Sequence, residues 1–274
     1  MAGPGQAAGT EAGRHGRFLH GVASSTTDRA MYSTTDRAIL SSHVRRPIRP
    51  KPTASEKPPA GEARTPRTRR RRSDGERSHQ EILRAAAALA SVEGLDGLSI
   101  ASLAEHVGLS KSGLFAHFRS KEELQLETIR MAEEIFQEEV VRPGLAAPAG
   151  VARVRALVLR FLDHVRRRTF PGGCFFASVS AEVDGHPGKL RDVIAAKQRA
   201  WFGLFEQGIE DAQRLGEVDR RAEAPQVAFE VLSMLAGAHG TFLLQGNAAV
   251  LDRARRGVDA VLSTHARKRA RPSG

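Results

Sequence analysis

Cysteine, tryptophan and tyrosine are nearly absent from this sequence, which has one of each among its 274 residues. A single cysteine excludes an intramolecular disulfide and a zinc site made of four cysteines. Long apolar runs are also missing: no stretch of about 18 uninterrupted apolar residues occurs. The nearest candidate, 227–251, is interrupted by Glu230, His239, Gln245 and Asn247. We therefore expect a soluble, cytoplasmic protein that has no membrane partner.

Acidic residues are scarce in the first part of the chain. Residues 1–78 carry 16 basic and 7 acidic side chains, a net charge of +9, whereas 79–274 have a net charge of only +2. Residues 1–75 also hold 7 of the 13 prolines and only two aromatic residues, Phe18 and Tyr32. Such a segment buries too little apolar area to offset its chain entropy, so we predict a disordered tail over 1–75. Within it, Met31 is an alternative start, and a transit peptide is the minor alternative to a simple arginine-rich tail.

The texture of the sequence changes after residue 78. Apolar residues recur at helical spacing, and alternation of β-branched residues is almost absent, which indicates an all-α fold. The first predicted helix places Ile82, Ala86 and Leu89 on one face and ends at Gly94. The predicted helices are 77–93, 100–107, 111–118, 121–140, 151–168, 174–184, 188–214, 224–245 and 248–266.

Serine residues mark the starts of three helices in the first half of this region. Ser99, Ser110 and Ser120 each precede a helical stretch and have the side chain that favours an N-cap. Glu123, three residues after Ser120, completes the pattern of a capping box. Two short helices joined by a short turn form a helix-turn-helix. Gly108 suits this turn because glycine adopts the positive φ that such a turn commonly needs.

The run from Leu98 to Leu124, LSIASLAEHVGLSKSGLFAHFRSKEEL, resembles the DNA-binding domain of the TetR/AcrR family of bacterial repressors. The resemblance implies an all-helical homodimer. Its parts would be a three-helix DNA-binding domain at 76–125, a helical effector-binding and dimerisation domain at 126–266, and a basic tail at 267–274.

The resemblance also implies which residues contact DNA. The recognition helix would begin at Lys111, with Phe115 where the family usually has a tyrosine that reaches a phosphate. Phe115 lacks that hydroxyl, and its ring could contact a thymine methyl group instead. The implied contacts to bases or phosphates are Ser110, Lys111, Ser112 and Gly113, and the implied phosphate contacts are His117 and Lys121. An ordinary solvated role is the alternative for Lys121, and a structural role is the alternative for His117.

An arginine run lies just before the first predicted helix. Residues 79–124 carry four basic and six acidic side chains, which is unfavourable for a domain that must approach DNA. Arg69, Arg70, Arg71 and Arg72 would correct this deficit. We predict that they form an arm along the phosphates or in the minor groove and supply much of the salt-dependent affinity. A solvated tail is the alternative.

The C-terminal half suggests an effector site and a dimer interface. By analogy with the family and from its apolarity, we assign 224–266 to homodimerisation. Aromatic residues cluster in this half, and pockets are mainly apolar with a few polar groups. The predicted effector contacts are Phe161, His164, Cys174, Phe175, Trp201 and Phe205, with core packing as the alternative for each aromatic ring.

Motifs typical of enzymes are not present. The sequence contains no Gly-x-Ser-x-Gly, no Walker loop and no Gly-x-Gly-x-x-Gly, and we expect no enzymatic activity, cofactor or metal site. We predict a sequence-specific transcriptional regulator that a small hydrophobic or aromatic effector releases from a palindromic operator in double-stranded DNA. The alternative is a non-specific, nucleoid-type protein that binds DNA through its arginines.

Overall fold

The computed structural model describes residues 67–185 and 187–267, and this part of the chain is helical, with two isolated β-bridges and no longer strand. The prediction of an all-α fold is confirmed. The helices are α2 (Arg67–Gly97), α3 (Ile100–Val107), α4 (Lys111–Phe115), α5 (Lys121–Phe136), the π-helix η1 (Gln137–Val141), α6 (Arg142–Leu145), α7 (Val151–Arg166), α8 (Phe175–Val183), α9 (Lys189–Arg214), α10 (Ala224–Gln245) and α11 (Ala249–Thr264).

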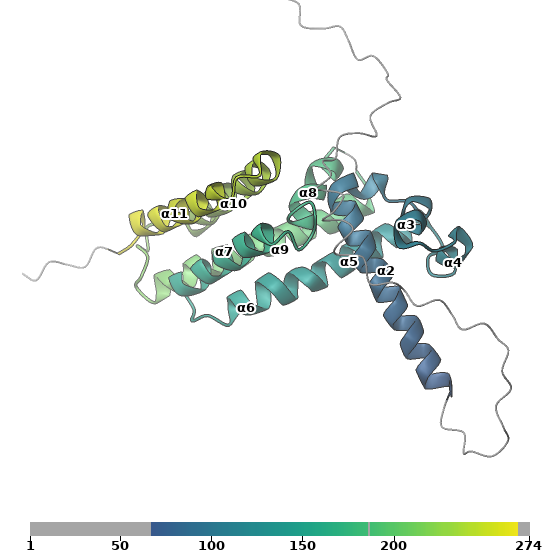
Figure 1. Cartoon of the computed structure of the whole chain (residues 1–274). Helices are drawn as coiled ribbons and strands as arrows, with labels where there is room; N and C mark the ends of the chain where they lie inside the picture. Colours follow the sequence, from purple (N-terminus) through teal and green to yellow (C-terminus); the bar gives the residue numbers. More distant parts are fainter. Residues whose placement is uncertain (1–66, 186, 268–274) are drawn as a thin grey trace, which may run out of the picture.

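The helices form a layered C-terminal unit with the short helices α3 and α4 at one end (Figure 1). Helices α10 and α11 lie side by side as the outermost layer, α7 and α9 lie behind them, and α5, η1 and α6 form the far side. Helix α5 runs from the neighbourhood of α3 and α4 into the C-terminal unit. It therefore belongs to both parts of the molecule.

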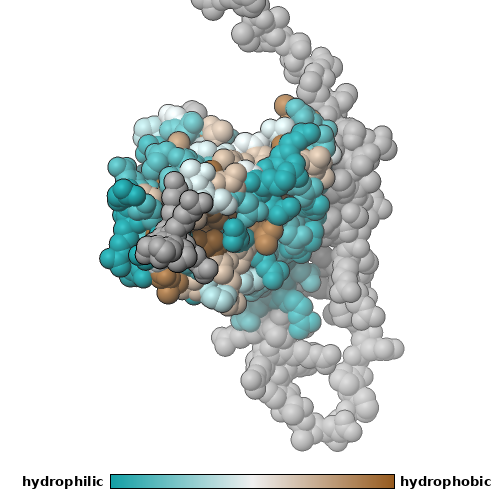
Figure 2. Space-filling view, turned by 90° about the vertical axis from the view of Figure 1, so that its left-hand side faces the viewer, coloured by the Kyte–Doolittle hydropathy of each residue, from teal (hydrophilic) through white to brown (hydrophobic). Residues whose placement is uncertain are grey.

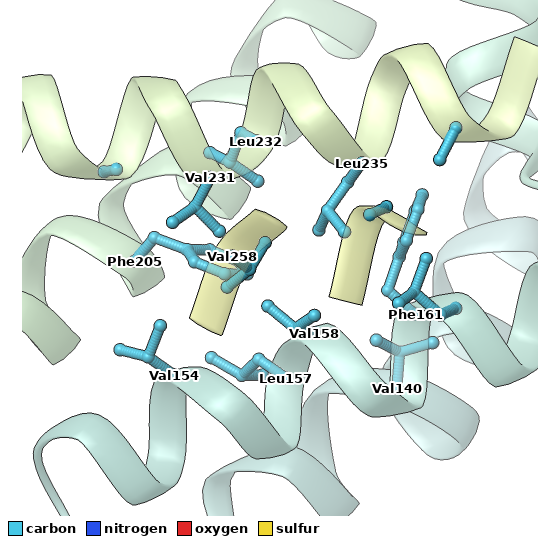
Figure 3. Close-up of a cluster of buried hydrophobic side chains, with 14 of the residues drawn as sticks. Val140, Val154, Leu157, Val158, Phe161, Phe205, Val231, Leu232, Leu235 and Val258 are labelled. Atoms are coloured by element: carbon cyan, nitrogen blue, oxygen red, sulfur yellow. The ribbon is translucent and has the colours of Figure 1, made fainter. Parts of the chain in front are cut away.

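Two clusters of buried residues hold the fold together. The first joins α2, α3, α4 and most of α5, and it includes the fully buried Phe118. The second joins α7, α9, α10 and α11. Figure 3 shows Val231, Leu232 and Leu235 of α10 pointing toward Val158 and Phe161 of α7. Burial of these apolar side chains is the main favourable contribution to folding.

The serine caps form as predicted, with one difference at Glu123. Ser99 accepts a hydrogen bond from the amide of Ser102, Ser110 from that of Gly113, and Ser120 from that of Glu123. The Glu123 carboxylate, however, accepts from the amide of Arg119 at 2.6 Å, one residue before the N-cap. The carboxylate thus satisfies a free amide at the same helix end, but the two side chains do not form the reciprocal box.

Helix α2 begins earlier than the sequence predicts. It starts at Arg67, so the boundary of the predicted tail is wrong for 67–75, whereas residues 1–66 lie outside the described part of the chain. Four consecutive arginines favour this extension, because arginine is a strong helix former. Gly94 adopts φ 78°, ψ 170°, which kinks the helix at the predicted stop.

Four further helix ends also differ from the prediction. The recognition helix α4 ends at Phe115, and the long helix expected to reach residue 140 changes into the π-helix η1 after Phe136. Helices α7 and α11 each end two residues before the predicted limit. Such differences are ordinary at helix ends, where the last turn frays. The π-helix is more informative, because its wider turn rotates the residues that follow it.

Helix α8 connects the two clusters. Its residues Phe175, Val179 and Val183 pack in the N-terminal cluster against α2, although they follow α7 in sequence. The loop before α8 touches α2 directly: the amide of Gly172 donates to Ser91 Oγ at 3.0 Å. A Cβ on Gly172 would lie 1.9 Å from the carbonyl oxygen of Ser91, so only glycine fits at this contact.

Helix α10 is apolar on almost every side. Among the described residues it is the one helix long and apolar enough to cross a membrane by length and composition, with a mean hydropathy of 1.5. Its inner side packs on α7, α9 and α11, which accounts for part of this apolarity. Figure 2 shows the end of the molecule farthest from α3 and α4, where hydrophobic atoms lie in small areas between hydrophilic ones.

Candidate DNA interface and effector cavity

Helix α4 presents its polar side to solvent. Leu114 and Phe118 anchor the helix in the N-terminal cluster with no exposed surface. The opposite side is open: Ser110, Lys111, Ser112 and Gly113 are all exposed. Gly108 ends α3 with φ 69° and so sets the turn between the two helices. The arrangement is that of a helix-turn-helix whose second helix is free to enter a major groove.

Phe115 also lies on the open side of α4, where its side chain is 57% exposed. A large aromatic ring in that position buries no core surface, so a contact with a partner would account for it. The ring has no hydroxyl to donate to a phosphate, which leaves apolar contact with bases or sugars as its chemistry.

Two candidate phosphate contacts follow α4. Lys121 Nζ donates to the carbonyl oxygen of Asp96 at 2.7 Å, which holds the side chain at the N-terminus of α5 and leaves two of its protons for another acceptor. His117 lies against His79, with ring centroids 5.6 Å apart. Burial lowers the pKa of His117, and the neighbouring His79 lowers it further, so the imidazole is neutral at pH 7 and would reach a phosphate as a hydrogen-bond donor.

The arginine run lies on a helix rather than on an extended arm. Residues 69–72 form part of the first turns of α2, and this end of α2 projects away from the body of the protein (Figure 1). A helix is about 10–12 Å wide, whereas the minor groove is only about 6 Å wide. Of the two predicted positions, along the phosphates or in the minor groove, a helical arm favours the first, and its contact with DNA stays a prediction.

A cavity of about 690 Å³ lies in the C-terminal unit between α5, α9 and α10. This volume suits a drug-sized ligand. Its wall contains several aromatic rings. One is Trp201, which packs edge-on against Phe136 with the ring centroids 5.0 Å apart. The aromatic and aliphatic residues of the wall are Phe136, Val141, Leu145, Phe161, Phe176, Ile194, Trp201, Phe202, Leu204, Leu232 and Leu235.

The structure brings three of the six predicted effector residues to this cavity. Phe161, Cys174 and Trp201 line it, whereas His164, Phe175 and Phe205 are fully buried elsewhere. Phe175 packs in the N-terminal cluster and Phe205 in the C-terminal one. Those two rings pack in the core, which is the alternative role given above for each aromatic residue.

Cys174 is a buried thiol at the cavity wall. It precedes α8, and burial raises the pKa of its thiol to about 11. A protonated thiol is a poor nucleophile, so Cys174 acts as a small apolar group there. Its backbone amide donates to His239 Nε2 at 3.0 Å, and burial lowers the pKa of that imidazole. His239 thus caps the start of α8 in its neutral form.

The charged residues of the wall were not predicted from the sequence. Lys197 of α9 and Glu133 of α5 both line the cavity and form an ion pair at 2.5 Å. A signal was available: Lys197 lies four residues before Trp201 and three after Ile194, on the inward side of an amphipathic helix. A lysine at such a position interrupts an apolar face and points to a polar role.

His164 lies behind the cavity and belongs to a polar cluster around Glu139. Its Nδ1 is 3.0 Å from the Glu139 carboxylate, which also accepts from Thr169 Oγ1 at 2.6 Å. These hydrogen bonds, together with the charge of Arg167, lower the pKa of Glu139 to about 2. The imidazole edge faces Phe136 and Phe170, so His164 supports the wall from outside rather than lining it.

We expect the variant Glu139→Gln to lose stability at neutral pH and to unfold less steeply in acid. The depressed pKa of Glu139 contributes stability that is present above the ordinary glutamate value of 4.5 and is lost as the pH falls toward about 2. The amide does not titrate, so this contribution disappears. Thermal unfolding of the variant and the wild type across that pH range measures the difference. The exposed neighbour Glu138→Gln is the control, and equal pH profiles for Glu139→Gln and wild type would contradict the assignment.

Together, the exposed helix α4 and the apolar cavity define a class of protein: a helix-turn-helix DNA-binding protein with a helical ligand domain. Family comparisons give the same class in more detail. Residues 82–128 match the family described as "Bacterial regulatory proteins, tetR family", and residues 150–258 match the "Tetracyclin repressor-like, C-terminal domain". The chain belongs to the TetR family of transcriptional regulators, as the resemblance predicted.

Solved structures share the fold at low sequence identity. A TetR transcriptional regulator from Chloroflexus aurantiacus J-10-FL is 23% identical, with a TM-score of 0.67, over 72% of this chain and 100% of that one. AibR, in complex with isovaleryl coenzyme A and operator DNA, is 23% identical with a TM-score of 0.55, over 65% of this chain and 95% of its own. The ketosteroid regulator KstR2 of Mycobacterium tuberculosis is 16% identical with a TM-score of 0.55, over 70% and 96%. No curated protein sequence matches the chain.

Proposed function

We propose that this protein is a repressor that binds a palindromic operator as a homodimer and leaves it when a small apolar effector fills the cavity. The observation that supports this most directly is the course of α5. The helix begins beside the exposed recognition helix α4, with Lys121 at its first position, and its other end carries Glu133 and Phe136 in the cavity wall. A ligand that prefers one position of α5 would shift the DNA-binding unit by differential affinity.

The proposed dimer interface centres on α10. Its outward side carries an uncharged strip, here called the α10 strip, with exposed apolar residues at both ends: Phe229 is 56% exposed and Leu244 is 88% exposed. The other members of the α10 strip are Ser233, Ala236, Gly237 and Gly240. Small residues allow two helices to approach closely, as in a four-helix bundle of two subunits. The exposed side of α11 carries Arg253, Arg255 and Arg256 and suits the polar rim of such an interface.

In this dimer the two copies of α4 would enter successive major grooves about 34–36 Å apart. Ser110, Lys111, Ser112 and Gly113 would approach bases or phosphates, and Phe115 would touch apolar base edges. His117 and Lys121 would hold phosphates on either side. We place this function in the bacterial cytoplasm, with the protein on the nucleoid when it is bound to DNA.

We expect Lys121→Ala to lower the affinity for every DNA sequence by a similar factor. One lost phosphate contact should reduce the slope of log K against log salt by about one unit without changing sequence preference. Binding of operator and random duplexes over a range of salt concentrations measures both effects. Arg214→Ala, at the far end of α9, is the matched control. Wild-type affinity for Lys121→Ala would remove Lys121 from the interface.

Selection of bound fragments from the genomic DNA of the source tests the proposal as a whole. The purified full chain, at about 0.15 M salt, should enrich a palindrome whose half-sites are one helical turn apart. Lys111→Ala should shift the enriched motif, because in the proposed complex that residue would face the groove. The effector would then be sought among small apolar molecules related to the products of neighbouring genes. Strong binding with no enriched motif would contradict the proposal.

That last outcome would favour the second candidate, a non-specific protein that binds through its arginines. The helical extension of α2 with Arg69, Arg70, Arg71 and Arg72 motivates it. If this extension lies along phosphates, deletion of residues 1–72 should flatten the plot of log K against log salt, since each lost phosphate contact removes about one unit of slope. The same measurement on the full chain is the reference. An unchanged slope would show that the arginine run does not touch DNA.

A further inference from the structure

An ion pair lies at the wall of a mainly apolar cavity, whose other polar side chains are Gln137, Ser180, Gln198, Ser233 and His239. Lys197 Nζ of α9 is 2.5 Å from the Glu133 carboxylate of α5, and the two side chains are 34% and 29% exposed. They are therefore only partly buried, where an ionic group keeps some of its water. Of the described residues that line the cavity, these two are the only ones that carry a formal charge at neutral pH, because burial lowers the pKa of His239.

The cavity reaches the surface on a second side, along α10. Ser233, Ala236 and Gly240 line the cavity and are also exposed members of the α10 strip. In the proposed dimer a second subunit would cover that side. The partly exposed pair Lys197–Glu133 would then lie at the side of the cavity that stays open to water. The polar head group of an amphipathic ligand would lie there, and its apolar body would fill the cavity.

We propose that the effector is an apolar molecule with one anionic group, such as a carboxylate, that takes the place of Glu133 beside Lys197. This inference rests on the proposed function in that it takes the cavity as the effector site. Glu133 is half-buried and can turn toward solvent when it is displaced. The ammonium of Lys197 would keep an anionic partner throughout, so no charge is left unpaired in the cavity.

The sign of the ligand charge follows from the other groups that face the cavity. The first turn of α8 contributes Phe176 and Ala177 to the wall, next to the N-cap Cys174, whose amide donates to His239 Nε2. A helix N-terminus carries a partial positive charge, which favours an anion in the cavity and disfavours a cation. A cationic ligand would also have to displace Lys197 from Glu133 and leave its ammonium without an anionic partner in the same cavity wall.

The same exchange would act on α5. The pair Lys197–Glu133 is one of two ion pairs between α9 and α5; the other joins Lys189 to Glu122 at 3.5 Å and is more exposed. An anion on Lys197 breaks the first pair and leaves the second intact. It therefore loosens α5 from α9 at the cavity end and not at the end that carries Lys121.

Fluorescence of Trp201 tests the ligand class directly, because Trp201 lines the cavity and is the only tryptophan in the chain. The full-length protein, without DNA, is titrated with decanoate, decanol and decylammonium, which share one apolar body and differ in charge. We expect decanoate to bind about tenfold more tightly than decanol, as a charge-assisted contact to lysine would provide. Decylammonium should bind most weakly. Equal binding of decanoate and decanol, tighter binding of decylammonium, or no response to any of the three would overturn the inference.

Matched variants assign the preference to the pair. Lys197→Gln should lose the preference for decanoate and keep its affinity for decanol, which also shows that the cavity is intact. Glu133→Gln should bind decanoate more tightly, because the competing carboxylate is gone. Lys189→Gln removes the other ion pair between the same two helices and should leave all three affinities unchanged. An unchanged preference in Lys197→Gln would overturn the inference. These titrations contain no DNA. They therefore test the ligand site even if the proposed operator binding proves wrong.

Discussion

Gly237→Glu is expected to convert the dimer into folded monomers and to lower operator affinity by at least about a hundredfold. Gly237 lies in the middle of the α10 strip, and a Cβ on it would meet no atom within 4 Å in the single subunit. The subunit therefore has room for the side chain. In the dimer, the two glutamates would be buried near the two-fold axis, and an unpaired buried charge costs about 3–5 kcal/mol. By the usual conversion this is a factor of at least about one hundred in the dissociation constant.

Sedimentation and operator titration measure the two effects of Gly237→Glu. Its thermal stability as a monomer should not fall, because glutamate favours a helix more than glycine does. Gly185→Glu is the matched control: Gly185 lies in the turn before α9, also with no atom within 4 Å of a Cβ, and this variant should remain dimeric. A dimer of unchanged strength in Gly237→Glu would move the interface away from the α10 strip.

Phe118→Ala is expected to reduce the free energy of unfolding by about 3–5 kcal/mol, as the loss of a fully buried phenylalanine does elsewhere. Phe118 has no exposed surface, and its ring contacts that of His79 at a centroid distance of 5.2 Å. It lies three residues after the end of α4, so the space left by the ring would also free the recognition helix. We expect DNA binding to weaken together with stability.

Phe115→Ala separates the two roles of this segment. Phe115 is on the same turn but 57% exposed, so its loss should change stability by no more than about 0.5 kcal/mol. DNA affinity should nevertheless fall if the ring contacts base edges. Denaturant unfolding and operator titration of both variants give the comparison. A loss of stability below about 1 kcal/mol for Phe118→Ala would contradict its place in the core, because buried phenylalanines cost more.

The N-terminal unit could be predicted closely because its signals are local. Each serine cap accepts a hydrogen bond from the amide three residues ahead. The positive φ of Gly108 is likewise a requirement of the local turn and does not depend on distant residues. Side chains three and four residues apart meet on one helix face, so the buried positions Ile82 and Leu89 follow from spacing alone. The start of α2 was predicted less well, since composition argued for disorder where the backbone continues as a helix.

The C-terminal unit could be predicted only in part. Helix spacing located α7 to α11 within a few residues, but it could not divide aromatic residues between core and cavity. Phe161 and Trp201 line the cavity while Phe175 and Phe205 do not, and all four look alike in sequence. The difference depends on which neighbouring helix faces each ring, and those neighbours are distant in the chain.

The sequence by itself determined the helical class and the helix-turn-helix, because these rest on periodicity and on contacts within four residues, and the resemblance of residues 98–124 indicated the family. The tertiary structure alone decided three things: that α8 packs on α2 through the Gly172–Ser91 contact, that an apolar cavity lies along α5, and that Lys197 meets Glu133 in its wall. Each joins residues far apart in the chain. Packing of whole helices brings them together, and the shape of the fold determines which side chains meet.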